Sequence, residues 1–273
     1  MLSSFIGLNL IFALRMKIIF KKYQGTGNDF IMIDNLNGLY DDLSIKQIAF
    51  ACDRKMGIGG DGLIKISSIN GFDFEVEYYN SDGSQSFCGN GARCSVAFAK
   101  ELGVITNDTR FLAIDGEHKA SCIDGNVRLE MLPVEKIEEV GHDFFLDTGS
   151  PHYVHFSENE KIDIVSFGKK VRYSEKYKIA GVNVNVVNKG PGSSISVLTY
   201  ERGVEDETLS CGTGVTACAL VHMKNKNDFN ILEVNTKGGQ LFVEATFNEI
   251  TGGFNDIWLT GPALKVYEGS IDV

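Results

Sequence analysis

CGNGARCSVA at residues 88–97 recurs as CGTGVTACAL at residues 211–220, so a cysteine-glycine motif precedes a run of small residues twice. The leading cysteines of the two motifs are 211 − 88 = 123 positions apart. A second pair of segments, GNDFI at residues 27–31 and GSPHYV at residues 149–154, keeps nearly the same offset, 149 − 27 = 122. Two matches at one spacing predict duplicated halves of about 120 residues, an ordinary domain size.

Each motif leads into a predicted helix that is apolar almost all round, which is typical of a helix buried on every side. Residues 92–102 form the first such run, and Gly103 ends it. Alternating or β-branched stretches such as residues 17–23 and 72–79 predict strands. We therefore expect an α/β (α+β) fold with two pseudo-symmetric domains, each built of strands wrapped around a central helix.

The expected boundary lies near Pro133. The N-terminal half would contain residues 16–133 together with the C-terminal tail at about 262–273, and the C-terminal half residues 134–261. Residues 1–15 are apolar but too short to span a bilayer, and their only basic residue follows the apolar run. They are predicted to be an N-terminal extension outside the fold, or to reflect a start site before Met16. A secretory signal is the alternative.

The chemistry expected of the two motifs centres on Cys88 and Cys211. Glycines after a cysteine expose backbone N–H groups, and a helix beginning there surrounds the sulfur with unpaired donors and the positive end of the helix dipole. This setting predicts a stabilised thiolate, a lowered cysteine pKa and a place for a substrate carboxylate. Two such thiols on opposite sides of one ligand suit the inversion of a carbon stereocentre, in which one removes a proton and the other returns one.

The composition of the chain limits the classes of partner that we expect it to bind. The chain has 273 residues and a net charge of −10, which disfavours nucleic acid and is compatible with a small ligand. None of the six cysteines forms a C-x-x-C pair, so no zinc or other metal site is expected. A chain of this length needs no disulfide framework, and we expect free thiols in the cytoplasm, away from any membrane.

One further motif is rejected. Residues 57–62, GIGGDG, satisfy G-x-G-x-x-G formally, but a helix-like run precedes them and a strand-like run follows. A dinucleotide site requires the reverse order, so we interpret the segment as a turn that borders the site. No pyridoxal-binding lysine motif stands out, and no cofactor is expected.

These features together resemble the diaminopimelate epimerase family. The resemblance runs from about Met16 to the C-terminus and rests on five segments in the order of that family. They are GNDF at residues 27–30, NSDGS at 80–84, CGNGARC at 88–94, YERG at 200–203 and CGTG at 211–214.

The resemblance implies a pyridoxal-independent isomerase that interconverts LL- and meso-diaminopimelate for lysine and peptidoglycan synthesis. It implies two similar domains of largely antiparallel strands that close over the substrate, with Cys88 and Cys211 as the acid/base pair. The residues it implies for substrate binding are Asn28, Asn80, Gly89, Asn90, Asn183, Glu201, Arg202, Gly212 and Thr213. Arg202 would hold the distal carboxylate through a bidentate fork.

One position departs from the family pattern. Ser150 stands where many members have Asn, so its contact with the distal end of the substrate is expected to be lost or bridged by water. His152, and also Glu201, are candidates for polarising a thiol, although a structural role for His152 is equally compatible with the sequence. Cys52, Cys94, Cys122 and Cys218 lack the glycine context and are expected to be core residues.

Three alternatives remain. A proline racemase-like enzyme would share the architecture but would not need Glu201, Arg202 and three asparagines for a second charged end. A thiol redox protein would use Cys88 and Cys211 as a disulfide pair, and a non-catalytic amino-acid binding protein would leave the paired thiols without a purpose. The sequence does not determine the oligomeric state, for which a homodimer is one candidate.

Overall fold

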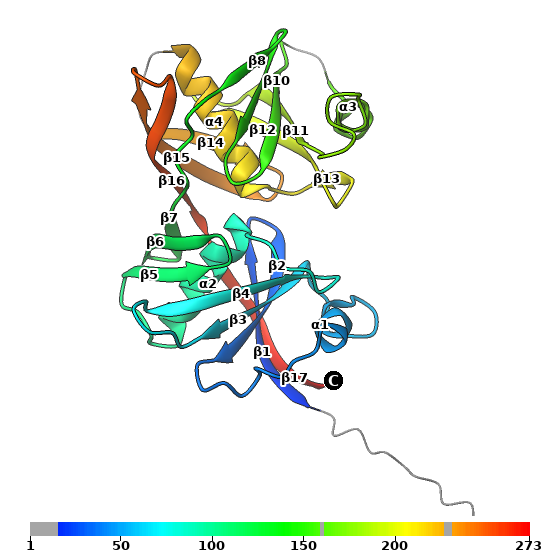
Figure 1. The fold of residues 1–273 in the computed structure, drawn as a ribbon, viewed down its shortest axis with the longest axis vertical. Coiled ribbons are helices and arrows are strands. Elements are labelled where there is room, and N and C mark those ends of the chain that lie inside the picture. The colour runs from blue at the N-terminus through cyan, green and yellow to red at the C-terminus, as the bar shows by residue number, and fades with distance from the viewer. Residues whose placement is uncertain (1–15, 159–160, 227–230) are drawn as a thin grey trace, which may run out of the picture.

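The structure is a computed structural model that describes residues 16–158, 161–226 and 231–273. The extension expected at residues 1–15 lies outside the described residues. Two groups of elements lie one above the other and are joined by long strands (Figure 1). Within the described ranges, no helix is long and apolar enough to cross a membrane.

The first group, here called the first half, begins at the N-terminal strand. Its elements are β1 (Lys17–Gly25), β2 (Asn28–Asn35), α1 (Ile45–Cys52), β3 (Gly62–Ser67), β4 (Phe74–Asn80), α2 (Gly89–Glu101), β5 (Asp108–Ala113), β6 (Gly116–Ile123) and β7 (Asn126–Glu130). Neighbouring strands are antiparallel except at β2–β3 and β4–β5, where a helix crosses between two parallel strands.

The second half repeats this order. Its elements are β8 (Glu138–Val140), β9 (Asp143–Asp147), β10 (Pro151–Phe156), α3 (Ile164–Arg172), β11 (Asn183–Lys189), β12 (Ile195–Glu201), β13 (Asp206–Thr208), α4 (Gly212–Lys226), β14 (Ile231–Thr236), β15 (Gly239–Asn248) and β16 (Gly253–Pro262). The parallel pairs are β10–β11 and β12–β14, across α3 and α4. Each half thus has the same succession of strands, crossover helices and hairpins, which is the topology expected of a duplicated unit.

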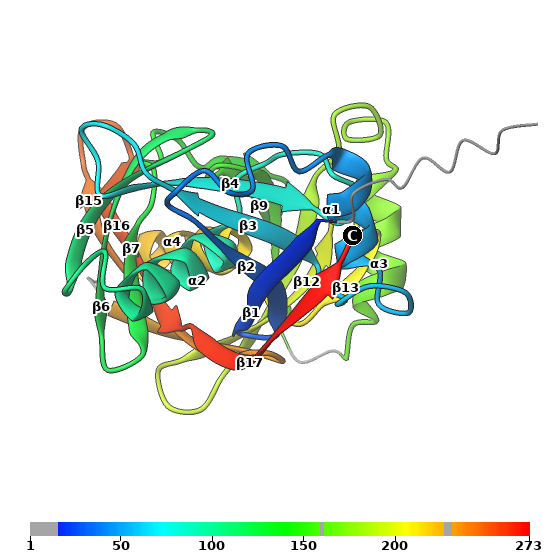
Figure 2. The same cartoon turned by 90° about the horizontal axis from the view of Figure 1, so that it is seen from below.

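The two halves are connected through strands as well as through the chain. β16 pairs antiparallel with β7, and β17 (Leu264–Asp272) returns to the first half, where it pairs antiparallel with β1. Figure 2 shows β1 and β17 side by side. The C-terminal strand is therefore part of the sheet that begins at the N-terminus.

The helices α2 and α4 are the buried axes of their halves. Cys94, Val96 and Phe98 on α2 are at most 1% exposed, and Val215 and Leu220 on α4 are fully buried. Both helices belong to one hydrophobic core that is continuous through the two halves. Strands wrap around each helix in both views (Figures 1 and 2). α2 begins at Gly89, three residues before the run from which it was predicted.

The hairpin between β1 and β2 reaches across to the second half. Its turn residues, Thr26 and Gly27, have φ of 51° and 88°, the left-handed conformation that a tight two-residue hairpin turn requires. A Cβ at Gly27 would lie 2.7 Å from a methyl group of Leu209, and a Cβ at Gly238 would lie 1.8 Å from the Thr26 carbonyl oxygen. These glycines let the hairpin approach the second half closely, which carries Asn28 to the junction.

Candidate active site

Cys88 occupies the N-cap position of α2. Its backbone is extended, with φ −136° and ψ 113°, and its Sγ accepts a hydrogen bond from the Gly91 backbone N–H at 3.5 Å. The first N–H groups of a helix have no intrahelical partner and carry the positive end of the helix dipole. The sulfur thus lies where the sequence analysis placed it, at a helix start.

Cys211 has the equivalent position in the second half. α4 begins at the next residue, and the Cys211 carbonyl accepts from the Val215 N–H at 2.8 Å, as the Cys88 carbonyl accepts from the Ala92 N–H at 2.7 Å. The second cysteine is 9% exposed. The two motifs therefore have the same local geometry.

The starts of α2 and α4 meet at the junction of the halves. The Asn90 Nδ2 group donates to the Ser210 carbonyl at 3.0 Å. The same Leu259 methyl group would lie 3.1 Å from a Cβ at Gly212 and 4.0 Å from a Cβ at Gly89. Leu259 of β16 therefore separates the two helix starts, and a larger residue at Gly212 would push them apart.

The pKa expectation for the two thiols is wrong. Burial raises the pKa of Cys88 to about 11 and that of Cys211 to about 12, against an ordinary value near 9. The backbone N–H groups of Gly91 and Gly214 act in the opposite direction, as the sequence analysis expected, but desolvation of a thiolate outweighs them. The nearby Glu201 carboxylate raises both pKa values further.

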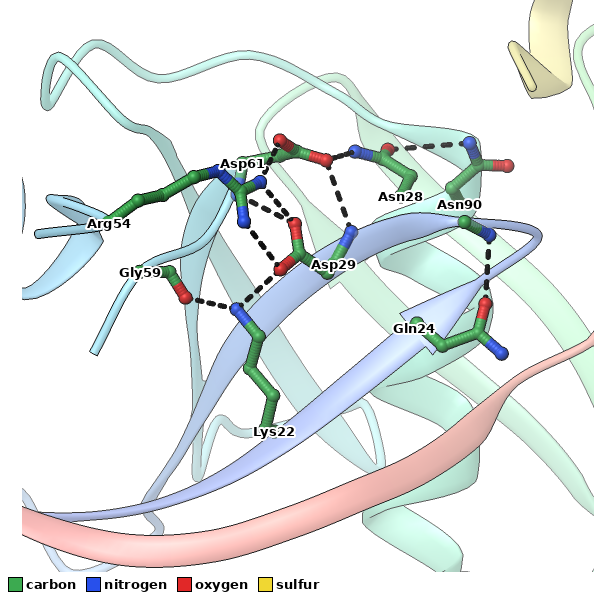
Figure 3. Close-up of polar contacts among 9 residues, drawn as sticks. Lys22, Gln24, Asn28, Asp29, Arg54, Gly59, Asp61 and Asn90 are labelled. Carbon is green, nitrogen blue, oxygen red and sulfur yellow. Dashed lines mark hydrogen bonds and ion pairs between the residues drawn. The ribbon is translucent and has the colours of Figure 1, made fainter. Parts of the chain in front are cut away.

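Two asparagine amides lie against Cys88. The Cys88 Sγ is 3.6 Å from the Asn28 Oδ1, which also accepts from the Asn90 Nδ2 at 3.3 Å. The Asn28 Nδ2 in turn donates to Asp61 Oδ2. Asp61 belongs to an ionic cluster with Asp29, Arg54 and Lys22, which lies beside the β1–β2 hairpin (Figure 3). Asn28 and Asn90, both implied by the resemblance, thus lie in contact with each other.

On the other side, His152 reaches Cys211 only through Thr213. The His152 ring Nε2 is 2.9 Å from Thr213 Oγ1, which is 3.4 Å from the Cys211 Sγ. The other ring nitrogen, Nδ1, lies 3.1 Å from Asn185 Nδ2, and the Asn185 Oδ1 accepts from Thr199 Oγ1. Since Nδ1 faces an NH₂ group, it accepts a hydrogen bond there, and Nε2 carries the ring hydrogen. The Thr213 hydroxyl then accepts from His152 and is free to donate to Cys211.

The residues expected to bind the distal end of the substrate form a second cluster. Asn183 Nδ2 donates to Ser150 Oγ at 2.8 Å, and Asn183 Oδ1 accepts from the Arg202 backbone N–H at 2.9 Å. Arg202 Nη2 lies 3.4 Å from Ser150 Oγ, and its Nη1 donates to the Ala180 carbonyl at 3.0 Å. Ser150 is therefore in contact with both neighbours despite its short side chain. In the described part of the chain no carboxylate forms an ion pair with this guanidinium.

Glu201 and Asn80 complete the expected set. Burial raises the pKa of Glu201, and the charge of Asp61 adds to this effect. Asn80 ends β4 and bonds mainly within its own turn, with its Nδ2 donating to Ser84 Oγ at 3.0 Å and its Oδ1 accepting from the Tyr78 hydroxyl at 2.9 Å. These hydrogen bonds do not join Asn80 to either cluster around the thiols, and its role in substrate binding stays a prediction.

Sequence reasoning missed several polar residues of this region, chiefly Asp61, Arg93 and Asn185. Asp61 lies in the glycine-rich segment that was interpreted only as a turn, and Arg93 lies inside the quoted CGNGARC motif. Asn185 follows Asn183 by two positions on β11, so the two side chains share a face of the strand. That alternation was the available signal for Asn185.

The remaining features do not compete with this site. Cys52, Cys94, Cys122 and Cys218 are buried, free thiols. Among the described residues, no three His, Cys, Asp or Glu side chains are grouped as metal ligands would be. A cavity of about 590 Å³ lies elsewhere, on the outer face of β5 and β6, where its lining residues Arg110 and Arg128 already form ion pairs with glutamates.

Solved structures share this fold. A PhzF-family phenazine biosynthesis protein from Bacillus anthracis matches with a TM-score of 0.74 at 12% identity, over 94% of this chain and 100% of that chain. A hydroxyproline epimerase from Agrobacterium vitis matches with a TM-score of 0.70 at 14% identity, over 94% and 93%. The chain therefore has the proline racemase and PhzF-like fold, and the expected mixed α/β architecture is confirmed.

Sequence comparison is more specific. A family model described as diaminopimelate epimerase matches residues 20–137 and 144–264. A diaminopimelate epimerase from Flavobacterium psychrophilum is 48% identical over 254 residues, which cover 92% of this chain and 98% of the relative. One from Chlorobaculum tepidum is 38% identical over 259 residues, covering 91% and 99%. The chain belongs to the diaminopimelate epimerase family, and the predictions of that resemblance and of an isomerase are confirmed.

Proposed function

We propose that this protein interconverts LL- and meso-diaminopimelate by proton transfer at the α-carbon between Cys88 and Cys211, without a cofactor, in lysine and peptidoglycan precursor synthesis. The observation that carries the proposal is the meeting of two cysteine-capped helix starts at the junction of the halves. One thiolate would remove the α-proton from one face of the carbon, and the opposite thiol would deliver a proton to the other face.

Binding at this junction would use the exposed N–H groups of the two helix starts. The backbone groups of Gly89, Asn90, Gly212 and Thr213 would hold the α-carboxylate, because negative charge develops there as the α-proton leaves. A closed junction without water would strengthen these contacts. We therefore place the reacting carbon between the two halves, divided as residues 16–133 with the tail 262–273, and residues 134–261.

The raised thiol pKa values have a chemical use in this scheme. An α-proton of an amino acid is very weakly acidic, and a thiolate with a pKa of about 11 or 12 is a stronger base than one of ordinary pKa. Burial thus lowers the fraction of each cysteine that is ionised, but it makes the thiolate a stronger base. The ammonium group of the substrate would favour formation of the thiolate by its positive charge.

The second cluster would bind the distal end of the substrate. Arg202 has a guanidinium without a carboxylate partner among the described residues, beside Asn183 and Ser150. Such a group suits the second carboxylate of a diamino diacid, and Glu201 suits its ammonium group. A proline racemase-like substrate has neither group, which favours the longer substrate.

The experiment measures the incorporation of deuterium from the solvent into the substrate. Incubation of LL-diaminopimelate with the enzyme in heavy water should place deuterium at the α-carbon without added cofactor, as read by mass spectrometry. Cys88→Ala and Cys211→Ala should each lower epimerisation by about 10³-fold or more. Cys122→Ala, on β6, is the matched control and should keep activity. Absence of label with reduced wild-type protein, or turnover retained by either active-site variant, would contradict the proposal.

Two further proposals concern the setting. Six free cysteines support residence in the reducing cytoplasm, where a thiol pair stays active. A homodimer is proposed as the assembly, and sedimentation equilibrium of the purified chain tests it. The net charge of −10 supports the expectation that nucleic acid is not a partner.

A further inference from the structure

Two amides beside Cys88, those of Asn28 and Asn90, are held between groups whose hydrogen-bonding roles cannot change. At one end, the Asp61 carboxylate accepts from Asn28 Nδ2. At the other end, the Arg93 guanidinium donates through Nη2 to Asn90 Oδ1 at 3.0 Å. An ionised carboxylate only accepts hydrogen bonds and a guanidinium only donates them. Both amide orientations are therefore fixed by their outer partners.

This fixed polarity has a consequence at the sulfur. Because the NH₂ group of Asn28 faces Asp61, its Oδ1 must face Cys88, at 3.6 Å. The NH₂ group of Asn90 also donates to that oxygen, at 3.3 Å, and to the Ser210 carbonyl, at 3.0 Å. An amide oxygen can accept from a protonated thiol but repels a thiolate. The arrangement thus favours Cys88 with its proton on.

Asp61 is held firmly in this role. Its other carboxylate oxygen, Oδ1, pairs with Arg54 Nη2 at 2.6 Å, and the same guanidinium bridges to Asp29. Lys22, which is 4% exposed, pairs with Asp29 at 2.8 Å. Figure 3 shows this cluster continuing without a break into Asn28 and Asn90. Rotation of the Asp61 carboxylate away from Asn28 would break the ion pair as well.

Arg93 is held equally firmly at the other end. Its side chain is fully buried, and its Nη2 bonds to Thr26 Oγ1 at 3.1 Å in addition to Asn90. Its Nε and Nη1 have no hydrogen-bond partner among the described residues. A buried cation with so few acceptors would lose one of them if the Asn90 amide turned over, which opposes the turn.

We propose that Asp61 and Arg93 are positioning residues for Cys88 that act through Asn28 and Asn90, and that in the empty site they hold the Asn28 amide oxygen, not its NH₂ group, against the Cys88 sulfur. The inference rests on the proposed function for the meaning of the thiol pair. At Cys211 the polarity is opposite, because the Thr213 hydroxyl accepts from His152 and is free to donate to that sulfur.

Other charged and titratable groups also face Cys88, and all of them except Arg93 are common to every arm of the test. Arg93 on α2 favours its thiolate, and Glu201 on β12 opposes it. Tyr78 on β4, Cys94 on α2 and Cys211 before α4 lie close enough to influence it or to be influenced by it. A change in the Cys88 titration that depends on Asn28 separates the amide from all of these groups.

The test measures the pH dependence of Cys88 alkylation by iodoacetamide. Cys88 is partly exposed, and it is the sole cysteine between Lys65 and Arg93, so the corresponding tryptic peptide reports on it alone. In Asp61→Asn, the carboxylate no longer holds the Asn28 amide, which can turn its NH₂ group toward the sulfur at the cost of the 3.3 Å bond from Asn90. The midpoint should then fall by about one pH unit, the effect of one hydrogen bond on a thiolate. Loss of structure would also lower the midpoint, because burial is what raises the pKa of Cys88, so circular dichroism must first show that the variant is folded.

A double-mutant cycle separates the amide from the charge of Asp61. In an Asn28→Ala background, Asp61→Asn should leave the midpoint unchanged, because no amide remains to be turned. Asp41→Asn is the matched control, since Asp41 Oδ1 fixes the amide of Asn35 at 2.8 Å in the same way but away from the cysteines. It should leave the Cys88 midpoint at the wild-type value.

Arg93→Gln tests the other end of the network and keeps the inference testable if Asp61→Asn does not fold. Loss of this cation by itself should raise the midpoint, because Arg93 favours the Cys88 thiolate and Asp61 still holds Asn28. The effect of Arg93 through the amides is therefore measured as a smaller rise than in the Asn28→Ala background, with the alkylated residue located by tandem mass spectrometry. An unchanged midpoint in a folded Asp61 variant, or an Asp61→Asn shift that survives in the Asn28→Ala background, overturns the inference. Deuterium incorporation by the wild-type enzyme is measured in parallel, so that failure of the proposed function is seen separately.

Discussion

The imidazole of His152 is 2.9 Å from the hydroxyl of Thr213, which is 3.4 Å from the Cys211 sulfur and so connects the ring to the thiol. The ring is fully buried, and its second nitrogen faces the amide of Asn185. Burial lowers the pKa of His152 from 6.5 to about 3, and the charge of Arg202 adds to this effect. The ring is therefore neutral near pH 7, and we expect it to orient Thr213 rather than to carry charge.

This neutral histidine predicts a pH dependence of stability. The unfolded chain binds a proton at His152 below about pH 6.5, whereas the folded chain does not until about pH 3. The free energy of unfolding should therefore fall as the pH drops from about 6.5 toward 3. His152→Gln should flatten that slope in urea titrations between pH 7 and 4. His142→Gln, which changes an exposed histidine, is the control, and an equal flattening there would refute the explanation.

Arg202 provides a prediction about substrate binding. Arg202→Gln removes the charge beside Asn183 and Ser150, and Arg202→Lys keeps the charge but not the fork. We expect KM for diaminopimelate to rise by about 10- to 100-fold in the first variant and by less in the second, with kcat changed little. Steady-state kinetics measures both constants. A large fall in kcat with unchanged KM would assign Arg202 to the chemical step instead.

The two glycines that end the C-G-x-G motifs should differ in tolerance. A Cβ at Gly214 would lie 2.5 Å from Asn185 Oδ1 and 3.3 Å from His152 Cε1, whereas a Cβ at Gly91 would meet the flexible tip of Ile64 at 3.1 Å. Gly214→Ala should destabilise the fold by about 1–3 kcal/mol and lower activity. Gly91→Ala should destabilise the fold by less. Thermal unfolding of the two variants measures both losses of stability, and a larger loss in Gly91→Ala would contradict the prediction.

Glu101 ties α2 to the terminal strands. It accepts from Lys21 at 2.8 Å and Lys265 at 3.0 Å, and from the Tyr23 hydroxyl. Burial acts to raise its pKa, but these hydrogen bonds outweigh it and lower the pKa from 4.5 to about 2.

The stability that Glu101 contributes is full above about pH 4.5 and is lost as the pH falls through about 2. Glu101→Gln should therefore lower stability at pH 7 by about 1 kcal/mol, a value reduced for solvent screening, and should not do so at pH 2. Glu117→Gln, which breaks an exposed pair with Arg110, should change stability less. Equal losses at both pH values would contradict the assignment.

The sequence alone determined the repeat, the two helices and the pairing of Cys88 with Cys211 as equivalent positions. These depend on local pattern: glycines after cysteine permit a helix start, and an apolar run without a polar face predicts a buried axis. The repeated topology follows from them, since each half folds around its own helix. Arg202 is identified through the YERG segment of the family resemblance, and Asn183 only by what that resemblance implies.

The tertiary structure determines the pKa values and the hydrogen-bond partners of the site residues. Helix starts predicted lowered thiol pKa values, but burial between two halves raises them, and depth of burial cannot be derived from one motif. It also decided that His152 reaches Cys211 through Thr213, and that Asp61 and Arg93 fix the amides at Cys88. These contacts join residues up to 120 positions apart, as at Asn90 and Ser210. Local pattern fixes which groups are present, and only the packing of the two halves determines their partners and their exposure to water.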